Sequence, residues 1–488
     1  MPVIDQLYGH SLALLTDLYQ LTMAYGYWKL QMADHEAVFH LAFRKHPFGG
    51  GFSIACGLHE TIEYLRRLRF DSADLEYLAT ITGNDGKPFL DRGFLDYLAR
   101  LQFTCDVDAI PEGTVVFPYE PLVRVTGSLL QAQLLETPLL NLVNFPTLIA
   151  TKAARICLAA QGRPVLEFGL RRAQGIDGAV TASRAAFVGG CAATSNLLAG
   201  KLFGIPVRGT HAHSWVMSFD DELHAFEAYA RAMPNNCVFL VDTYDTLQGV
   251  RHATQVGSEL RHQNHEMAGI RLDSGDLAYL SIEARKILDE AGFPDAQIFA
   301  SNDLDETIIA SLEQQGARID AWGVGTKLAT AYDSPALGGV YKLSAIRAPG
   351  GAWEYRIKLS EQTAKTSIPG ILQVRRFRDA QNLFSADAIY DLPTGIDLPA
   401  TIVDPTDSAR RKTIPADAPG EDLLVPIFRR GKLVYDPPDL SAVQRRTQAQ
   451  LASLHPAVKR FVNPHRYPAG LESRLHGIRC TMIESAAK

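Results

Sequence analysis

One histidine of this chain stands in a polar segment that could carry group-transfer or proton-transfer chemistry. His213 lies in the run Gly209-Thr210-His211-Ala212-His213-Ser214, which a single residue separates from the apolar residues Ile205-Pro206-Val207. A neutral imidazole can accept a phosphoryl group or carry a proton near pH 7. A structural histidine is the alternative for His213. His211 would point the other way along an extended segment, so a structural role is predicted for it.

A second polar segment combines an arginine with carboxylates. Arg271-Leu272-Asp273-Ser274-Gly275-Asp276 follows the apolar run Ala268-Gly269-Ile270. Arg271 and Asp273 share one face if the backbone is extended. An arginine binds a carboxylate or phosphate through two hydrogen bonds, and an aspartate can bind sugar hydroxyls or a magnesium-bound diphosphate. A surface ion pair is the alternative, but so dense a polar cluster at a strand end favours function.

Glycines and a hydroxyl form a third segment, Gly323-Val324-Gly325-Thr326. It is expected after a strand and before a helix, where backbone N–H groups favour an anion such as phosphate. It does not match the glycine pattern of dinucleotide-binding proteins.

Three further places carry candidate residues. Glu167-Phe168-Gly169-Leu170-Arg171-Arg172 offers one arginine to a pocket, and Asp242-Thr243-Tyr244-Asp245 adds acceptors for hydroxyls or a cation. Tyr19 is a candidate stacking aromatic, with core packing as the alternative. The sequence does not identify which acidic residues would hold a metal ion.

These polar segments follow short apolar runs that repeat along the middle of the chain. Strand ends are predicted near Phe168, Arg208, Val241, Arg271, Ala300 and Gly323. Their spacing of roughly 25–40 residues is typical of strand–helix units in a parallel sheet. The predicted class is therefore α/β, with an irregular TIM-like α/β barrel whose strand ends bring the polar segments to one face.

The 488 residues are divided into three parts on this basis. Residues 1–133 are predicted to form an N-terminal α+β domain, residues 134–345 the catalytic barrel, and residues 346–488 a C-terminal segment that packs on the first domain. The segment from Leu135 to Ala160 reads as a long helix broken near Pro138 and Pro146.

Composition excludes several classes of protein. The hydrophobic fraction of 47%, the charged fraction of 21% and the net charge of −6 are those of a globular protein without a basic nucleic-acid surface. No apolar stretch approaches the ~20 residues needed to span a bilayer, and residues 1–6 do not resemble a signal peptide. The six cysteines form no CxxC pair, so free thiols in a cytoplasmic protein are expected.

Eight segments in the same order make the chain resemble the nicotinate phosphoribosyltransferase family over nearly its whole length. They are Thr16 to Gln20, Phe43 to Lys45 with Pro47 to Gly50, Glu136 to Asn141, Glu167 to Arg172, Gly209 to Ser214, Arg271 to Asp276, Gly323 to Thr326, and Asn463 to Pro468. The resemblance implies that nicotinate and 5-phosphoribosyl 1-diphosphate give nicotinate mononucleotide and diphosphate, in NAD biosynthesis. It also implies Mg²⁺, and ATP hydrolysis through a phosphohistidine.

The same resemblance assigns roles to individual residues. His213 is the residue phosphorylated, with Arg271 and Asp273 as further catalytic residues. Tyr19 stacks on the pyridine ring from a neighbouring subunit, which implies a homodimer with shared sites. Thr210 and Arg271 are contacts to nicotinate, and Thr326 is a contact to the phosphoribosyl group. The remaining substrate-binding residues are Arg171, Ser214, Gly323 and Gly325.

Competing functions remain open at this point. A nicotinamide phosphoribosyltransferase would use an aspartate to accept from the neutral amide, but the comparable stretch Gly189 to Asn196 holds no acid, which favours the nicotinate anion. A quinolinate phosphoribosyltransferase is shorter and needs no ATP. A non-catalytic sensor of pyridine precursors is disfavoured by the intact polar segments, and without the resemblance the residues indicate a barrel enzyme acting on sugar phosphates.

Overall fold

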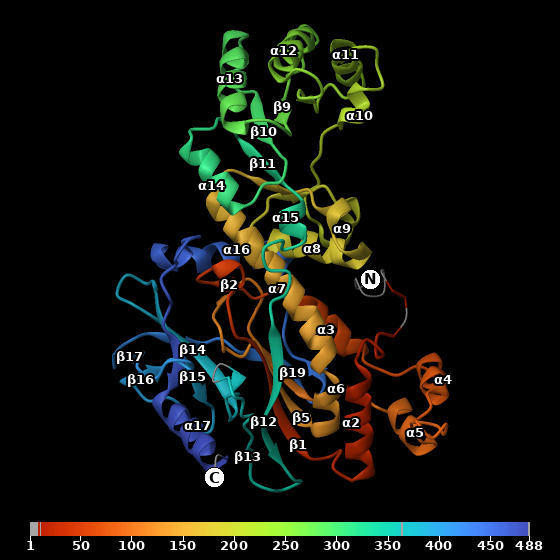
Figure 1. Ribbon diagram of the computed structural model, residues 1–488, viewed down its shortest axis with the longest axis vertical. Helices are drawn as coiled ribbons and strands as arrows, with labels where there is room; N and C mark the ends of the chain where they lie inside the picture. Colours follow the sequence, from red (N-terminus) through yellow and green to blue (C-terminus); the bar gives the residue numbers. More distant parts are fainter. Residues whose placement is uncertain (1–7, 10, 363–364, 487–488) are drawn as a thin grey trace. The chain divides into compact units, whose positions relative to one another are not determined.

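The computed structural model describes residues 8–9, 11–362 and 365–486, and it forms two compact units (Figure 1). The first unit comprises residues 1–148 with 336–488, and the second comprises residues 149–335. The sequence-based boundaries at residues 133 and 345 differ from these. The predicted lack of a signal peptide concerns residues 1–6, which lie outside the described residues.

The first unit is an α+β structure with strands from both ends of the chain. Its seven-stranded sheet has the order β13 (Glu354–Tyr355), β12 (Gly339–Arg347), β1 (Glu36–Phe43), β5 (Val123–Ser128), β3 (Asp106–Ala109), β19 (Val425–Arg429) and β20 (Lys432–Leu433). β1 pairs antiparallel with both β12 and β5. Residues 339–345, which the sequence assigned to the barrel domain, therefore belong to β12 of this sheet instead.

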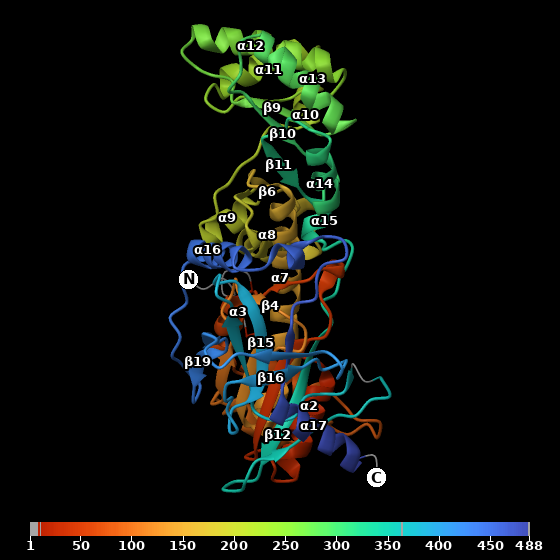
Figure 2. The same ribbon diagram turned by 90° about the vertical axis from the view of Figure 1, so that its left-hand side faces the viewer.

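A second sheet of the first unit consists of C-terminal strands. It has the order β17 (Arg411–Ile414), β16 (Ala400–Val403), β21 (Ala469–Glu472), β15 (Phe384–Asp391), β14 (Leu372–Arg378) and β18 (Gly420–Asp422), while β2 (Ser53–Ile54) pairs with β4 (Val115–Val116). The helices of this unit are α2 (Leu18–Lys29), α3 (Leu58–Arg67), α4 (Ser72–Thr80), α5 (Arg92–Ala99), α6 (Leu129–Leu134), α16 (Leu440–Ala452) and α17 (Ser473–Ala486). α17 packs along β16 (Figure 2).

The second unit is built on a six-stranded parallel sheet. Its order is β7 (Ala193–Thr194), β6 (Val165–Glu167), β11 (Ala321–Val324), β10 (Gln297–Ala300), β9 (Gly269–Leu272) and β8 (Val238–Leu240). The helices are α8 (Gly175–Gly189), α9 (Leu197–Phe203), α10 (His213–Val216), α11 (Glu222–Ala232), α12 (Thr246–His262), α13 (Leu277–Glu290), α14 (Glu306–Gln314) and α15 (Thr326–Ala329). The mixed α/β class is confirmed.

The predicted TIM-like barrel is not confirmed, because the described strands of this sheet do not close. Beyond β7, Val207 makes a single parallel bridge to Thr194. On the opposite edge, the backbone N–H of Leu240 in β8 donates to Nε2 of His211 over 3.2 Å. One side chain therefore spans the gap where a closed barrel would have a ladder of backbone hydrogen bonds.

Polar residues after the strands also begin the helices. Asp245, Asp276 and Asp305 are the N-caps of α12, α13 and α14, and each accepts hydrogen bonds from backbone N–H groups of the first turn. Such caps satisfy donors that the helix itself leaves unpaired. Some of the acidic residues at the strand ends therefore have a structural role as helix caps.

The long helix α7 (Glu136–Ala159) corrects two expectations. It is continuous through Pro146, so the predicted breaks are absent from it. It is also long and apolar enough to meet the length and composition of a membrane span, although 72% of that apolar window is buried inside the protein. Buried core helices have the same composition, so α7 is weak evidence for a membrane.

Candidate active site

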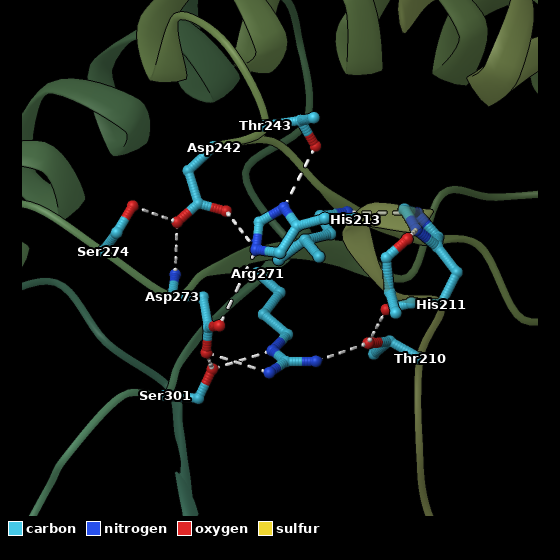
Figure 3. A network of polar contacts seen from close by, with 11 residues as sticks. Thr210, His211, His213, Asp242, Thr243, Arg271, Asp273, Ser274 and Ser301 are labelled. Atoms are coloured by element: carbon cyan, nitrogen blue, oxygen red, sulfur yellow. Dashed lines mark hydrogen bonds and ion pairs between the residues drawn. The ribbon is translucent and has the colours of Figure 1, made fainter. Parts of the chain in front are cut away.

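A network of polar side chains lies at the carboxyl ends of the parallel strands of the second unit (Figure 3). Four of the predicted residues belong to it, namely Thr210, His213, Arg271 and Asp273. These four come from two separate segments of the chain, and the candidates Asp242 and Thr243 join them from a third. The prediction that these polar segments meet at one face is confirmed for this group.

His213 is placed at the first position of α10 between a hydroxyl and two carboxylates. Its Nδ1 lies 3.1 Å from Oγ1 of Thr243. Its Nε2 lies 3.8 Å from Oδ2 of Asp273 and 4.0 Å from Oδ1 of Asp242. The side chain is 38% exposed, so a ligand can reach the ring.

Arg271 is fixed on three sides at the end of β9. Its Nε donates to Oγ of Ser301 (2.7 Å), its Nη1 to Oγ1 of Thr210 (3.2 Å), and its Nη2 to Oδ1 of Asp273 (2.9 Å). The side chain of Arg271 is only 15% exposed, so this is not the surface ion pair of the alternative interpretation. A guanidinium held in one orientation can present its charge to an anion at little entropic cost.

Asp242 brings a buried carboxylate to the network. Its side chain is 1% exposed, and Oδ2 accepts from the backbone N–H of Asp273 (2.8 Å) and from Oγ of Ser274 (2.6 Å). Oδ1 is buried without a hydrogen bond and is the oxygen that faces His213. Nε2 of His213 therefore faces two carboxylates, those of Asp242 and Asp273, while Nδ1 faces the hydroxyl of Thr243.

Sequence reasoning missed Ser301. Its hydroxyl joins Arg271 to Asp273 directly after β10, where it also makes a short hydrogen bond to Oδ1 of Asp273. Its place one residue beyond the predicted strand end at Ala300 was the available signal.

Other predicted residues lie at the same strand ends but outside the network drawn in Figure 3. Arg171 and Ser214 are exposed, and Thr326 begins α15. α15 has only four residues, so the helix contribution expected at this glycine segment is small. Gly325 packs tightly, since a Cβ there would lie 3.0 Å from the carbonyl oxygen of Phe168. Tyr19 belongs to the first unit, on α2, and is 48% exposed.

Two polar residues of the predicted segments, Glu167 and His211, have structural partners. Glu167 is buried and accepts from Oγ of Ser183 (2.8 Å) and Oγ1 of Thr194 (2.6 Å). His211 is also buried, and burial lowers its pKa to about 4, so the neutral ring accepts the hydrogen bond from Leu240. This geometry agrees with the structural role predicted for His211.

A cavity of about 450 Å³ adjoins the network. Thr210, Arg271, Ser301 and Gly323 line it, together with Ala193 of the stretch that holds no acid. In the part of the chain that the structure describes, no group of three or more histidine, cysteine or acidic residues is arranged to hold a metal ion.

The first unit has a separate cavity of about 490 Å³. Two segments singled out in the sequence line it, and they contribute Arg44 and Lys45 from one side and His465 and Arg466 from the other. Arg466 pairs with Asp404 over 2.6 Å. The Asn463 to Pro468 segment therefore lies beside basic residues that are far away in the sequence.

Comparisons with known proteins agree on one family. Residues 14–144 match the model of the nicotinate phosphoribosyltransferase N-terminal domain, and residues 372–479 match that of the C-terminal domain. The chain is 46% identical to nicotinate phosphoribosyltransferase of Bacillus subtilis over 486 residues, which cover 97% of both chains. It is 36% identical to the Homo sapiens protein of the same name over 524 aligned residues, which cover 95% of both.

The fold is likewise similar to a solved structure. Human nicotinic acid phosphoribosyltransferase superimposes with a TM-score of 0.83 at 33% identity, covering 96% of this chain and 99% of the human one. A Pyrococcus furiosus nicotinate-nucleotide pyrophosphorylase shares the fold with a TM-score of 0.68 at 21% identity.

Proposed function

The chain belongs to the nicotinate phosphoribosyltransferase family, and we propose that it joins nicotinate to the ribose of 5-phosphoribosyl 1-diphosphate. The products are nicotinate mononucleotide and diphosphate, and the reaction is a step of NAD biosynthesis. The observation that carries this proposal is the fixed guanidinium of Arg271 at the strand ends.

Arg271 binds the carboxylate of nicotinate. Its position beside the hydroxyl of Thr210 offers that anion a charged donor and a neutral one. The absence of an acid from the described stretch Gly189 to Asn196, of which Ala192 and Ala193 line the cavity, supports nicotinate over nicotinamide as the substrate.

The transfer itself requires stabilisation of opposite charges. The pyridine nitrogen attacks the anomeric carbon, the bond to the diphosphate oxygen breaks, and positive charge develops on the ribose. Asp273 and Asp242 are the nearby carboxylates that can stabilise this charge. Thr326 is assigned to the phosphoribosyl group, as the family resemblance implies, and Arg171, Ser214, Gly323 and Gly325 are assigned to the substrate pocket.

ATP is assigned to His213. The γ-phosphoryl group of ATP passes to a ring nitrogen of this histidine, and ADP leaves. Water later hydrolyses the phosphohistidine to inorganic phosphate. Roughly two added negative charges change the affinity of the site for anionic substrates and products, which couples hydrolysis to mononucleotide formation.

Mg²⁺ is assigned to the diphosphate of the substrate. This ion commonly keeps several waters and uses one or two carboxylates together with substrate phosphates. Asp242 and Asp273 are carboxylates at the network, and bound Mg²⁺ would neutralise charge on the leaving diphosphate.

A cytoplasmic homodimer with shared sites completes the proposal. Exposed apolar side chains support association: Leu18 and Tyr19 on α2 are 51% and 48% exposed. In the second unit, large apolar side chains are exposed in segments that follow the parallel strands: Leu170, Leu197, Tyr244 and Tyr279. Apolar surface of this kind marks protein interfaces, and Tyr19 would stack on the pyridine ring of the partner's site.

One assay tests the function. Purified protein is given 5-phosphoribosyl 1-diphosphate, Mg²⁺ and either nicotinate or nicotinamide, each with and without ATP, and mononucleotide is measured. We expect product from nicotinate, increased by ATP. Preference for nicotinamide would contradict the role of Arg271, and no product from either substrate would favour the sensor alternative.

A further inference from the structure

The cavity beside Arg271 continues along the inner face of the sheet of the second unit. Thr210 and Ser301 line it at the carboxyl ends of the strands, and Ala268 and Gln297 line it at the amino ends. Gln297 begins β10 and Ser301 follows its last residue, so both ends of one strand line the same cavity. The cavity therefore extends over the length of the strand.

Small residues in the sheet create this space. Side chains alternate between the two faces of a strand, and on β11 the alternate residues Ala321 and Gly323 line the cavity. Ala193 of β7 lines it as well. In closed α/β barrels, bulky branched residues at such positions fill the interior, whereas alanine and glycine here leave it hollow.

The volume exceeds what the proposed substrate needs. A cavity of about 450 Å³ is within the range that buries a drug-sized ligand. Nicotinate has one ring and one carboxylate, and Arg271 holds that carboxylate at one end. The ring then leaves free the part of the cavity that Phe299, Ala321 and Ala268 line.

We propose that this site also accepts pyridine-3-carboxylates that carry an unbranched, uncharged apolar substituent. The carboxylate binds Arg271, and the substituent lies along the part of the cavity lined by Ala193, Phe299 and Ala321. The inference rests on the proposed function for the position of the ring, and adds a class of ligand to it. Its physical basis is burial of the substituent against apolar walls, which is favourable for each methylene removed from water.

Three propyl isomers test the proposal, because the structure does not fix which ring carbon faces the cavity. The probes are 4-, 5- and 6-propylpyridine-3-carboxylate. Binding is measured by calorimetry, and turnover is measured with 5-phosphoribosyl 1-diphosphate, with nicotinate as the reference. We expect at least one isomer to bind within about tenfold of nicotinate.

A substitution that fills the cavity supplies the decisive comparison. Ala321→Leu places a larger side chain in it, and we expect the ratio of the dissociation constants of the accepted isomer and of nicotinate to rise about tenfold or more. Ala193→Leu does the same from another strand and keeps the test available if one variant fails to fold. Ala232→Leu is the matched control, at an exposed position at the end of α11.

Two results would overturn the proposal. In the first, no isomer binds while nicotinate does. In the second, an isomer binds, but Ala321→Leu and Ala193→Leu leave the ratio unchanged. Failure of the proposed function would be recognised separately, because nicotinate itself would then give no mononucleotide. In that case calorimetry with the propyl isomers would still decide whether the cavity binds them.

Discussion

Nη2 of Arg271 lies 2.9 Å from Oδ1 of Asp273, so the arginine proposed to bind the substrate anion is already paired with a carboxylate. Both side chains are mostly buried, which strengthens their interaction relative to a pair in water. The substrate carboxylate must therefore share Arg271 with Asp273. This arrangement predicts opposite effects on binding and on turnover when the aspartate is neutralised.

The variant Asp273→Asn tests that relationship. Removal of the charge leaves Arg271 more available, so KM for nicotinate should fall, while loss of the carboxylate near the ribose should lower kcat by about 100-fold. Steady-state kinetics with nicotinate as the varied substrate measures both. A higher KM would show that Asp273 contributes to binding instead.

Arg271→Lys should weaken nicotinate binding although it keeps the charge. A lysine ammonium cannot reproduce the planar fork that reaches Ser301, Thr210 and the substrate together. We expect kcat/KM to fall by roughly 10- to 100-fold, in keeping with the loss of a charged hydrogen bond. Arg251→Lys, at an exposed site on α12, is the control and should behave as the wild type.

His213→Ala should abolish the stimulation by ATP and keep basal transfer. Labelling with γ-³²P-ATP should give an acid-labile, alkali-stable phosphoprotein from the wild type and none from the variant, because a phosphoramidate bond needs the imidazole. His262→Ala, at the end of α12, controls for loss of a histidine in the same unit. Unchanged ATP stimulation in His213→Ala would remove this residue from the role.

His211 should make the protein less stable as the pH falls. Its folded pKa of about 4 lies below the usual value, so between about pH 6.5 and pH 4 the unfolded chain binds more protons than the folded one. The stabilisation of the folded state that comes from the lowered pKa of His211 is fully present above about pH 6.5. About 2 kcal/mol of this free energy should be lost between pH 7 and pH 5. Urea unfolding at the two pH values measures this.

His211→Gln is the matching variant, since its side-chain oxygen can accept from Leu240 without titrating. Its loss of stability between pH 7 and pH 5 should be smaller than that of the wild type by about the same 2 kcal/mol. Equal losses in the two proteins would mean that other groups determine the acid sensitivity.

The sequence predicts the parallel strands of the second unit well, because each is a short apolar run with a polar segment after it. The predicted ends at Phe168, Val241 and Ala300 lie within one residue of the ends of β6, β8 and β10. An apolar run and the polar segment that follows it are adjacent in the sequence, so they can be recognised without knowledge of the tertiary structure. The polar residues gather because the carboxyl ends of parallel strands share one edge of the sheet.

Closure of the barrel could not be predicted in the same way. Closure depends on whether the segment beyond β7, which contains Val207, forms backbone hydrogen bonds with the edge strand β8 (Val238–Leu240). These two segments are far apart in the sequence, so no local pattern shows whether they pair. The structure has the side chain of His211 at that place instead. The burial of Asp242 is also a result of tertiary packing, and α7 continues through Pro146 because packing can outweigh helix propensity.

The two units differ in when their residues become available for folding during synthesis on the ribosome. The second unit is one continuous segment, residues 149–335, whereas the first needs residues 336–488 to complete its sheets. β1, near the start of the chain, cannot pair with β12 until Gly339–Arg347 have left the ribosome. The second unit can therefore fold while β1 of the first unit still exposes an unpaired strand edge. An unpaired edge can pair with another chain, so the nascent protein is open to aggregation until β12 is available.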